Sequence, residues 1–319
     1  MTGGNSMKQN NFQCFILLLL MFLSVIPVWA QDRVPEQSMA DTPLSYPKQV
    51  EEYHRPARLI GVRNSMPASF KNTTENVIVD TTHSLVPFFG KLKRMREPVR
   101  IVHIGDSHIR GHVLSGQVRT DFERDFGHEA TLPDTVTYWS SGLAKETGLP
   151  GVVYHSIGIN GATCVNFTNP MQAQEIANLK PDLIIVSFGT NESHGRGYSV
   201  SEHDRQMDSL ISLLKEYCPN AVFLFTTPPG SYVRYRRKRS INPRTEQAVK
   251  TITSYAARNN MAYWNMYNIV GGRKSACLNW TGNNLMQRDR IHYTVDGYRI
   301  QGNLLYEALI KAYNDYVAN

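Results

Sequence analysis

Three residues of this chain have the types and spacing that nucleophilic catalysis needs, namely Ser107, Asp289 and His292. A serine hydroxyl attacks a carbonyl poorly until a neighbouring base takes its proton, and His292 is the candidate base. Asp289 stands three residues before His292. A local turn can therefore bring its carboxylate to the imidazole Nδ1–H and hold the tautomer. Together they would perform acyl transfer, provided that the fold brings the serine to the histidine.

The tetrahedral intermediate of such a reaction carries an oxyanion, which needs hydrogen-bond donors. The candidate donors are the N–H of Ser107 at a helix start, the N–H of Gly161 and the side-chain amide of Asn191. The glycine that supplies the second donor is open, because the same stretch of sequence also contains Gly158. We choose Gly161 because it follows Asn160 in an Asn-Gly turn.

Each of these signals also has an ordinary structural explanation. A Gly-Asp-Ser turn is mostly only a turn, Asn191 could cap a helix, and His292 could be a structural histidine. Asp289 could instead pair with Arg288 or Arg290 on the surface. Catalysis is favoured by the ordered set, in which each member follows a predicted strand or precedes the last predicted helix.

The elements that must position these residues alternate between strand and helix patterns. Runs of β-branched and apolar residues predict strands over 99–104, 152–159, 183–188, 221–226 and 261–264, with an edge strand within 72–80. Helical spacing of apolar residues predicts helices over 83–95, 110–126, 171–179, 202–217, 243–259 and 296–316. Strands that are apolar on both faces and separated by helices predict a parallel sheet covered on both sides. Ligands bind such sheets at the carboxyl ends of the strands.

Composition and charge limit the class of protein and its partners. The 319 residues are 41% apolar and 19% charged, which is typical of a globular domain and excludes a disordered chain. The formal net charge of +7 favours work near an acidic surface, such as a polyanionic glycan or a membrane face. No helix-turn-helix, zinc-finger or RNA-binding signature is present, so we expect no nucleic-acid partner.

The N-terminus has the pattern of a secretory signal peptide. Lys8 precedes an apolar run from Phe15 to Ala30, and we assign residues 1–30 to the signal. An uncleaved membrane anchor is the alternative, although the run is short for a span. No other stretch is long enough to cross a bilayer, so we expect no membrane span after cleavage. The proline-punctuated residues 31–80 predict an N-terminal extension, and 81–319 predict the domain that holds the candidate site.

Cysteine usage indicates a chain that is held together by its core. Cys164, Cys218 and Cys277 remain after the signal, so at most one intrachain disulfide can form. Their spacing matches no metal site, and we expect each to be a small buried hydrophobe.

The ordered blocks resemble those of the SGNH hydrolases, also called the GDSL esterase/lipase family, from about Val99 to the C-terminus. The first block reads Gly-Asp-Ser-His in place of Gly-Asp-Ser-Leu. The resemblance implies an α/β three-layer sandwich around a mainly parallel, five-stranded sheet of the flavodoxin-like type. It also implies a triad of Ser107, Asp289 and His292, an oxyanion hole of Ser107, Gly161 and Asn191, and no metal or organic cofactor.

Within that family the chain is most similar to bacterial peptidoglycan O-acetylesterases. The blocks that carry this likeness are Ile101–His108, Ser156–Gly161, Thr227–Tyr232 and Leu285–Thr294. The resemblance implies an exported enzyme of the periplasm or cell surface that removes acetyl groups from muramic acid. A lipase, thioesterase or arylesterase, an acetyltransferase, and a binding protein on a retained hydrolase fold are the alternatives. The polar residues near the predicted site favour a small acyl group on a sugar.

Three residues are candidates for contacts with such a substrate, namely His108, Glu192 and Arg234. Arg234 opens a basic run that continues through Arg236, Arg237, Lys238 and Arg239. This run could meet an anionic glycan or be an ordinary solvated charge run. The sequence does not predict an oligomeric state.

Overall fold

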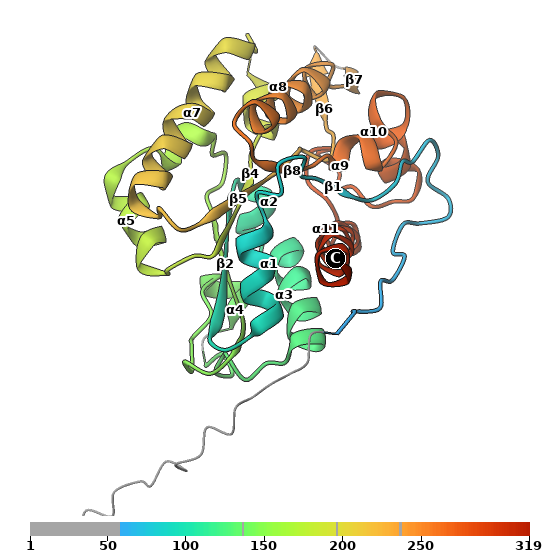
Figure 1. The fold of residues 1–319 in the computed structure, drawn as a ribbon. Helices are drawn as coiled ribbons and strands as arrows, with labels where there is room; N and C mark the ends of the chain where they lie inside the picture. Colours follow the sequence, from blue (N-terminus) through green and yellow to red (C-terminus); the bar gives the residue numbers. More distant parts are fainter. Residues whose placement is uncertain (1–57, 136, 196, 236–237) are drawn as a thin grey trace, which may run out of the picture. The chain divides into compact units, whose positions relative to one another are not determined.

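The computed structural model describes residues 58–319 except 136, 196, 236 and 237. A six-stranded sheet runs through it in the order β1-β8-β5-β4-β2-β3 (Figure 1). The strands are β1 (Ile78–Val79), β2 (Pro98–Gly105), β3 (Gly151–Gly158), β4 (Leu183–Ser187), β5 (Val222–Thr226) and β8 (Ala262–Trp264). All neighbours pair in parallel except β1, which pairs antiparallel with β8 at the edge. The mainly parallel sheet is confirmed. The predicted number of five strands is wrong, because the short strand β1 adds a sixth.

Helices cover both faces of this sheet, which confirms the three layers. The long helices are α1 (Val86–Arg94), α3 (Val113–Phe126), α5 (Pro170–Asn178), α7 (Val200–Tyr217), α8 (Arg244–Arg258) and α11 (Val295–Ala318). On β4, Leu183 and Ile185 pack with residues of α1, α3 and α11, whereas Ile184 and Val186 pack with residues of α5, α7 and α8. Successive side chains of a strand point to opposite faces, so this strand needs apolar residues at every position.

The sequence patterns missed seven elements of four or five residues and one helix of 11 residues. These are α2 (Ser107–Arg110), α4 (Tyr138–Ser141), the 3-10 helix η1 (Cys164–Phe167), α6 (Thr190–His194), β6 (Tyr232–Tyr235), β7 (Lys238–Ile241), α9 (Met266–Ile269) and α10 (Gly272–Gly282). Most are too short to show an apolar period. The helix predicted over 110–126 is broken before α3, because His112 has a left-handed backbone with φ of 56°.

Residues 58–80, which the sequence pattern assigned to the extension, pack on the folded unit. Ile60 and Phe70 are buried in the same apolar cluster as helix α11. Asn76 accepts a hydrogen bond from Trp264 Nε1 at 2.8 Å and donates to the carbonyl of Leu304 at 2.7 Å. The folded unit therefore includes this segment. The predicted signal and the first part of the extension lie outside the described residues.

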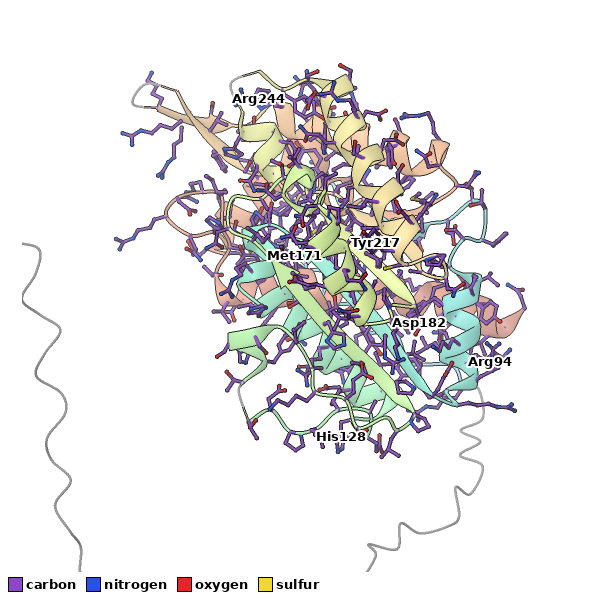
Figure 2. All side chains as sticks on the ribbon, turned by 90° about the vertical axis from the view of Figure 1, so that its left-hand side faces the viewer. Arg94, His128, Met171, Asp182, Tyr217 and Arg244 are labelled. Carbon is purple, nitrogen blue, oxygen red and sulfur yellow. The ribbon has the colours of Figure 1, made fainter. Side chains whose placement is uncertain are left out.

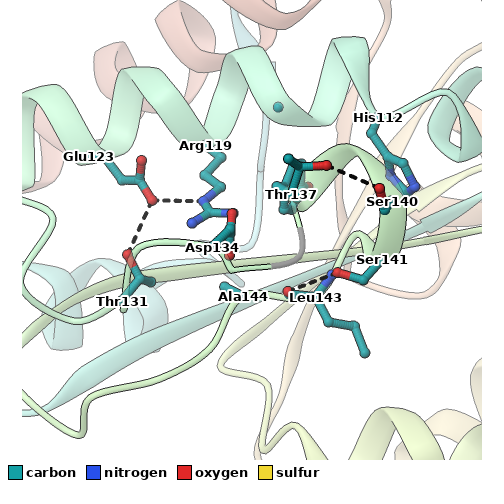
Figure 3. Close-up of polar contacts among 12 residues, drawn as sticks. His112, Arg119, Glu123, Thr131, Asp134, Thr137, Ser140, Ser141, Leu143 and Ala144 are labelled. Atoms are coloured by element: carbon teal, nitrogen blue, oxygen red, sulfur yellow. Dashed lines mark hydrogen bonds and ion pairs between the residues drawn. The ribbon is translucent and has the colours of Figure 1, made fainter.

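The segment between α3 and β3 is fastened to α3 by ionic contacts (Figure 3). Arg119 on α3 donates to Glu123 at 2.7 Å and to Asp134 of the segment at 3.1 Å. Glu123 in turn accepts a hydrogen bond from the Thr131 hydroxyl at 3.4 Å. The charges of Arg119 and Glu123 are therefore neutralised within the fold. The connection between α3 and β3 is thereby held close to α3.

The three cysteines of the described chain are buried and unpaired. Burial raises the pKa of the Cys277 thiol to about 12 and also raises those of Cys164 and Cys218. They act as small apolar side chains, as expected. Across the described ranges, no helix is both long and apolar enough to pass through a membrane.

The junction of β2 and α2 is tightly packed around Gly105. A methyl group at this position would lie 2.5 Å from Ile109 Cγ1 and 2.6 Å from the carbonyl oxygen of Ser187. The carbonyl belongs to the neighbouring strand β4 and cannot turn aside. Only glycine lets the sheet, the turn and the helix approach this closely.

Replacing Gly105 with alanine should therefore lower the free energy of unfolding by about 1–3 kcal/mol through overpacking. Urea denaturation followed by circular dichroism measures this change. Gly197→Ala is the matched control, since nothing lies within 4 Å of its Cβ position, and we expect it to stay within about 0.5 kcal/mol of the parent. Equal stability of both variants would contradict the packing argument.

Candidate active site

The structure presents Ser107 at the point where β2 ends and α2 begins. Asp106 caps this short helix, and its Oδ1 accepts the N–H of His108 at 2.9 Å. Ser107 is the first residue of the helix, so its N–H has no partner within the helix and can serve a ligand. The strand therefore delivers a hydroxyl and a backbone donor to the carboxyl edge of the sheet.

The predicted base and its orienting carboxylate meet this serine. His292 Nε2 lies 2.8 Å from Ser107 Oγ, and His292 Nδ1 lies 2.6 Å from Asp289 Oδ2. The other carboxylate oxygen accepts the N–H groups of Ile291 at 2.9 Å and His292 at 3.0 Å. Arg290 takes a left-handed backbone with φ of 62°, which closes the turn. The local Asp-x-x-His turn has the form that the sequence predicted.

The environment keeps Asp289 ionised and the pair accessible. Partial burial alone would raise the pKa of Asp289, but the hydrogen bonds from His292 and from the two backbone N–H groups outweigh it and lower the pKa. An ionised carboxylate can stabilise the imidazolium that forms when His292 takes a proton. The side chains of His292 and Asp289 are 33% and 44% exposed, so a bulky substrate can reach them.

Tyr293 anchors the loop that carries Asp289 and His292. This side chain is fully buried, and its hydroxyl donates to the carbonyl of Gly230 at 2.6 Å. The N–H of Gln287 donates to the carbonyl of His292 at 2.8 Å, which closes the loop on itself. The sequence predicted no role for Tyr293. Its position directly after the base was the available signal for an anchoring role.

The two glycines of the second block have different environments. A Cβ on Gly158 would lie 2.1 Å from the backbone nitrogen of Arg110, so this glycine lets β3 approach α2. Gly161 has a left-handed backbone with φ of 74°, and nothing lies within 4 Å of its Cβ position. Gly161 therefore borders open space, as an oxyanion donor must, whereas Gly158 is packed against protein.

Asn191 on α6 links this loop to the nucleophile turn. Its Nδ2 donates to the carbonyl of Ala162 at 2.9 Å and lies 3.3 Å from Asp106 Oδ2. The amide is thus held between the residue after Gly161 and the residue before Ser107. All three predicted oxyanion residues lie along one connected set of contacts.

Two of the predicted substrate contacts are buried instead. His108 is 7% exposed, and its Nδ1 lies 2.8 Å from Tyr298 Oη. Burial and then the charge of His292 lower the pKa of His108 to about 3, so the ring is neutral. The ring centroids of His108 and His292 are 5.4 Å apart, so His108 supports the base from behind.

Glu192 is the second buried residue, and its side chain is 4% exposed. One oxygen accepts the N–H of Cys164 at 3.1 Å, and the other accepts the N–H of Gly189 at 2.9 Å. The first donor follows the Gly161 loop, and the second precedes Asn191. Glu192 therefore joins the two loops that carry the oxyanion donors, a role that the sequence did not predict.

Glu192 also belongs to a cluster with Cys164 and His203, whose ligand-type atoms lie within 4.8 Å of one another. His203 Nδ1 lies 2.9 Å from the hydroxyl of Tyr198. Within the described residues, these three side chains are the ones that lie close enough together, and have the right ligand atoms, to bind a cation. Both Glu192 oxygens, however, already accept backbone N–H groups, and these contacts support an anchoring function.

Replacing Glu192 with glutamine should lower kcat on the order of 10- to 100-fold while KM changes little. The glutamine keeps one acceptor and turns an N–H₂ group towards a backbone N–H, so the donor loops shift, and such shifts cost transition-state binding. Steady-state hydrolysis of p-nitrophenyl acetate measures both constants. Glu202→Gln on the exposed start of α7 is the control, and equal kcat values for the two variants would refute the anchoring role.

The buried carboxyl of Asp106 has an unusual protonation equilibrium. Burial raises its pKa from 3.8 to about 8, against the lowering effect of the His108 N–H and with a further increase from the charge of Glu192. The folded protein therefore holds a proton that the unfolded chain releases between these two values. The contribution of Asp106 to stability falls as the pH rises through this window.

Asp106→Asn should remove this pH dependence and keep an acceptor for the helix cap. We expect the stability of the variant relative to the parent to increase from about pH 5 to about pH 8. Urea denaturation of both proteins across that range measures the difference. Parallel curves for the two proteins would show that Asp106 titrates normally in the folded state.

Arg234 is exposed on β6, away from these buried groups. Of the rest of its basic run, Arg236 and Arg237 lie outside the described residues, whereas Lys238 and Arg239 are exposed on β7.

The fold and this arrangement of serine, histidine and aspartate define a serine hydrolase. The model of the GDSL-like lipase/acylhydrolase family matches residues 104–300, which is more than half of the chain. The chain belongs to this family, as the resemblance implied, and is a hydrolase that acts on ester bonds. No curated protein matches the sequence closely enough to count as a relative.

One solved structure shares the fold, and two others align with lower scores. A peptidoglycan O-acetylesterase aligns with a TM-score of 0.64 and 16% identity, over 75% of this chain and 99% of that chain. A lipase/acylhydrolase from Enterococcus faecalis aligns with a TM-score of 0.47 and 21% identity, over 67% of this chain and 96% of that chain. An acetyl xylan esterase aligns with a TM-score of 0.48 and 16% identity, over 66% and 100% of the two chains.

Proposed function

We propose that this protein is an exported esterase that removes O-acetyl groups from a cell-wall polysaccharide, with peptidoglycan as the favoured substrate. The observation that carries the proposal is the contact of Ser107 Oγ with His292 Nε2 at 2.8 Å at an exposed edge of the sheet. The motif resemblance supports an acetylated glycan. So does the shared fold with a peptidoglycan O-acetylesterase. The signal pattern in residues 1–30 supports export to the periplasm or cell surface.

In the first half of the reaction, Ser107 Oγ attacks the acetyl carbonyl carbon while His292 Nε2 takes the hydroxyl proton. Asp289 holds the Nδ1–H and stabilises the imidazolium. The N–H groups of Ser107 and Gly161 stabilise the oxyanion, and the loss of one such donor costs roughly 3 kcal/mol. The amide of Asn191 adds a third donor when one of its two N–H bonds, to the carbonyl of Ala162 or to Asp106, is exchanged for the oxyanion. His292 then returns the proton to the sugar oxygen, and the ester C–O bond breaks.

In the second half, a water molecule attacks the acetyl-enzyme. His292 takes a proton from this water and gives it to Ser107 Oγ as the bond between the acetyl carbon and Ser107 Oγ breaks. Acetic acid leaves and ionises to acetate, and Ser107 and His292 are restored. No step requires a metal or an organic cofactor. A sugar hydroxyl in place of water would give acetyl transfer through the same acetyl-enzyme.

Ser107→Ala should lower acetate release from O-acetylated peptidoglycan by about 10⁴-fold or more, because the acetyl-enzyme cannot form. An enzymatic acetate assay measures the rate, and circular dichroism confirms that the variant folds. Residual activity near the parent rate would exclude the triad mechanism.

Parallel assays on acetylated xylan and on p-nitrophenyl butyrate separate the substrate classes. We expect peptidoglycan to give the highest kcat/KM. A preference for the butyrate ester would favour a lipase or arylesterase. Acetate release that falls when a sugar acceptor is added, with new acetylated sugar formed, would favour transfer.

A further inference from the structure

The strands β6 and β7 form an antiparallel hairpin that is separate from the central sheet. Its base is held by the N–H of Asn242, which donates to the carbonyl of Ser231 at 2.9 Å. The hydroxyl of Ser231 also lies 2.8 Å from His194 Nε2 on α6. The hairpin therefore rises from the carboxyl edge of the sheet, beside the helix that carries Asn191.

The hairpin is also bonded to the loop that carries the catalytic base. The N–H of Tyr232 donates to the carbonyl of Arg290 at 2.9 Å. Arg239 Nη1 donates to the carbonyl of Arg288 at 2.5 Å. These two carbonyls flank Asp289 in sequence, so the hairpin and the catalytic turn form one continuous surface.

This surface carries a cluster of positive charges that the fold does not neutralise. We call it the cationic rim, and it consists of Arg234, Lys238, Arg239, Arg288 and Arg290. Among the residues that the structure describes, none of these five takes part in an ion pair, whereas Arg119 and Arg124 are both paired with acidic side chains. Like charges on one surface repel one another, so the free energy of the surface falls when an anion binds there.

We propose that the cationic rim is a docking surface for the carboxylate groups of an anionic glycan strand whose acetyl ester enters the triad. This inference rests on the proposed function and names the class of glycan that the site takes. Guanidinium groups match the planar carboxylates of uronic acids, muramic acid derivatives and peptide stems. An anion held on the rim keeps its strand beside His292 and raises the local concentration of esters.

The surface chemistry favours a glycan over a membrane. A membrane-binding hairpin needs exposed apolar side chains that enter the lipid, in addition to its cations. Among the side chains whose burial is described, which on the hairpin are those of 232–234 and 238–241, no large exposed hydrophobic residue lies on β6, β7 or the loop 286–293. The exposed side chains there are mainly basic and polar.

The test is binding of the full-length Ser107→Ala protein to polygalacturonate, a carboxylated glycan without esters, measured by isothermal titration calorimetry. Dextran serves as the neutral glycan. We expect binding to polygalacturonate that weakens with salt, and no binding to dextran. Arg234→Gln combined with Lys238→Gln should raise the Kd about tenfold.

Arg94→Gln combined with Arg96→Gln removes the same charge from another surface and should leave the Kd unchanged. Both arginines are exposed near the start of β2, at the opposite end of the strand from Ser107. Figure 2 shows Arg94 far from Arg244, which begins α8 just after the hairpin. Thermal unfolding confirms that both double variants fold.

Equal weakening by the two double variants would overturn the proposal, since it would show an effect of net charge alone. Tighter binding to vesicles of anionic phospholipid than to polygalacturonate would overturn it in favour of a membrane. Because the probe carries no ester, these results do not depend on hydrolysis. Absence of acetate release from every acetylated glycan would contradict only the proposed function.

Discussion

The hydrogen bond between Ser107 and His292 joins residues 185 positions apart in the chain. Contacts between neighbours in sequence cannot bring these two residues together, so their hydrogen bond depends on the packing of the whole sheet. Parallel strands end at a common edge, and the proposed nucleophile lies at the end of β2, between β4 and the edge strand β3. The base comes from a loop that Tyr293 anchors to Gly230. The catalytic distance is thus a property of sheet packing and of one buried tyrosine.

The loops around the nucleophile are held mainly by contacts to backbone groups. Asp106 caps α2 through the N–H of His108, and Glu192 binds backbone N–H groups of both donor loops. A buried carboxyl group whose oxygens accept backbone N–H groups fixes the path of the chain regardless of which side chains surround it. The exposed residues at the mouth of the site can therefore vary without moving the reacting groups. Substrate preference and catalysis are separable in this architecture.

Much of the fold was predictable because its signals are local. Strands that need apolar residues on both faces, such as β4, and long amphipathic helices, such as α7, leave clear patterns. Short elements such as α6 and the hairpin leave none, because they are shorter than the period that would reveal them. The antiparallel strand β1 was only an edge-strand expectation, and it adds the sixth strand.

The residues of the candidate site also fall into those that the sequence could predict and those that it could not. The proximity of Ser107, Asp289 and His292 was predictable, because residue type and spacing indicate a shared chemistry, and the structure brings the three side chains together. Glu192 and His108 were assigned to the substrate although they are buried, since burial depends on what the rest of the chain places over them. The different surroundings of Gly158 and Gly161 likewise could not be predicted, because the packing of Gly158 against Arg110 depends on a contact between distant parts of the chain.

The four-residue turn from Asp289 to His292 has a consequence for motion. Aspartate and histidine sit in the same turn, and their contact is local, whereas the contact with Ser107 crosses between two separately anchored segments. Displacement of the 286–293 loop would therefore break the serine contact first and leave the imidazole correctly oriented. The contact between Ser107 and His292 can therefore break and form again while Asp289 keeps the proton of His292 on Nδ1. The Asp289–His292 turn is therefore a unit whose internal contact does not depend on Ser107. The β6–β7 hairpin is bonded to this loop, so a movement of the hairpin would move the turn with it.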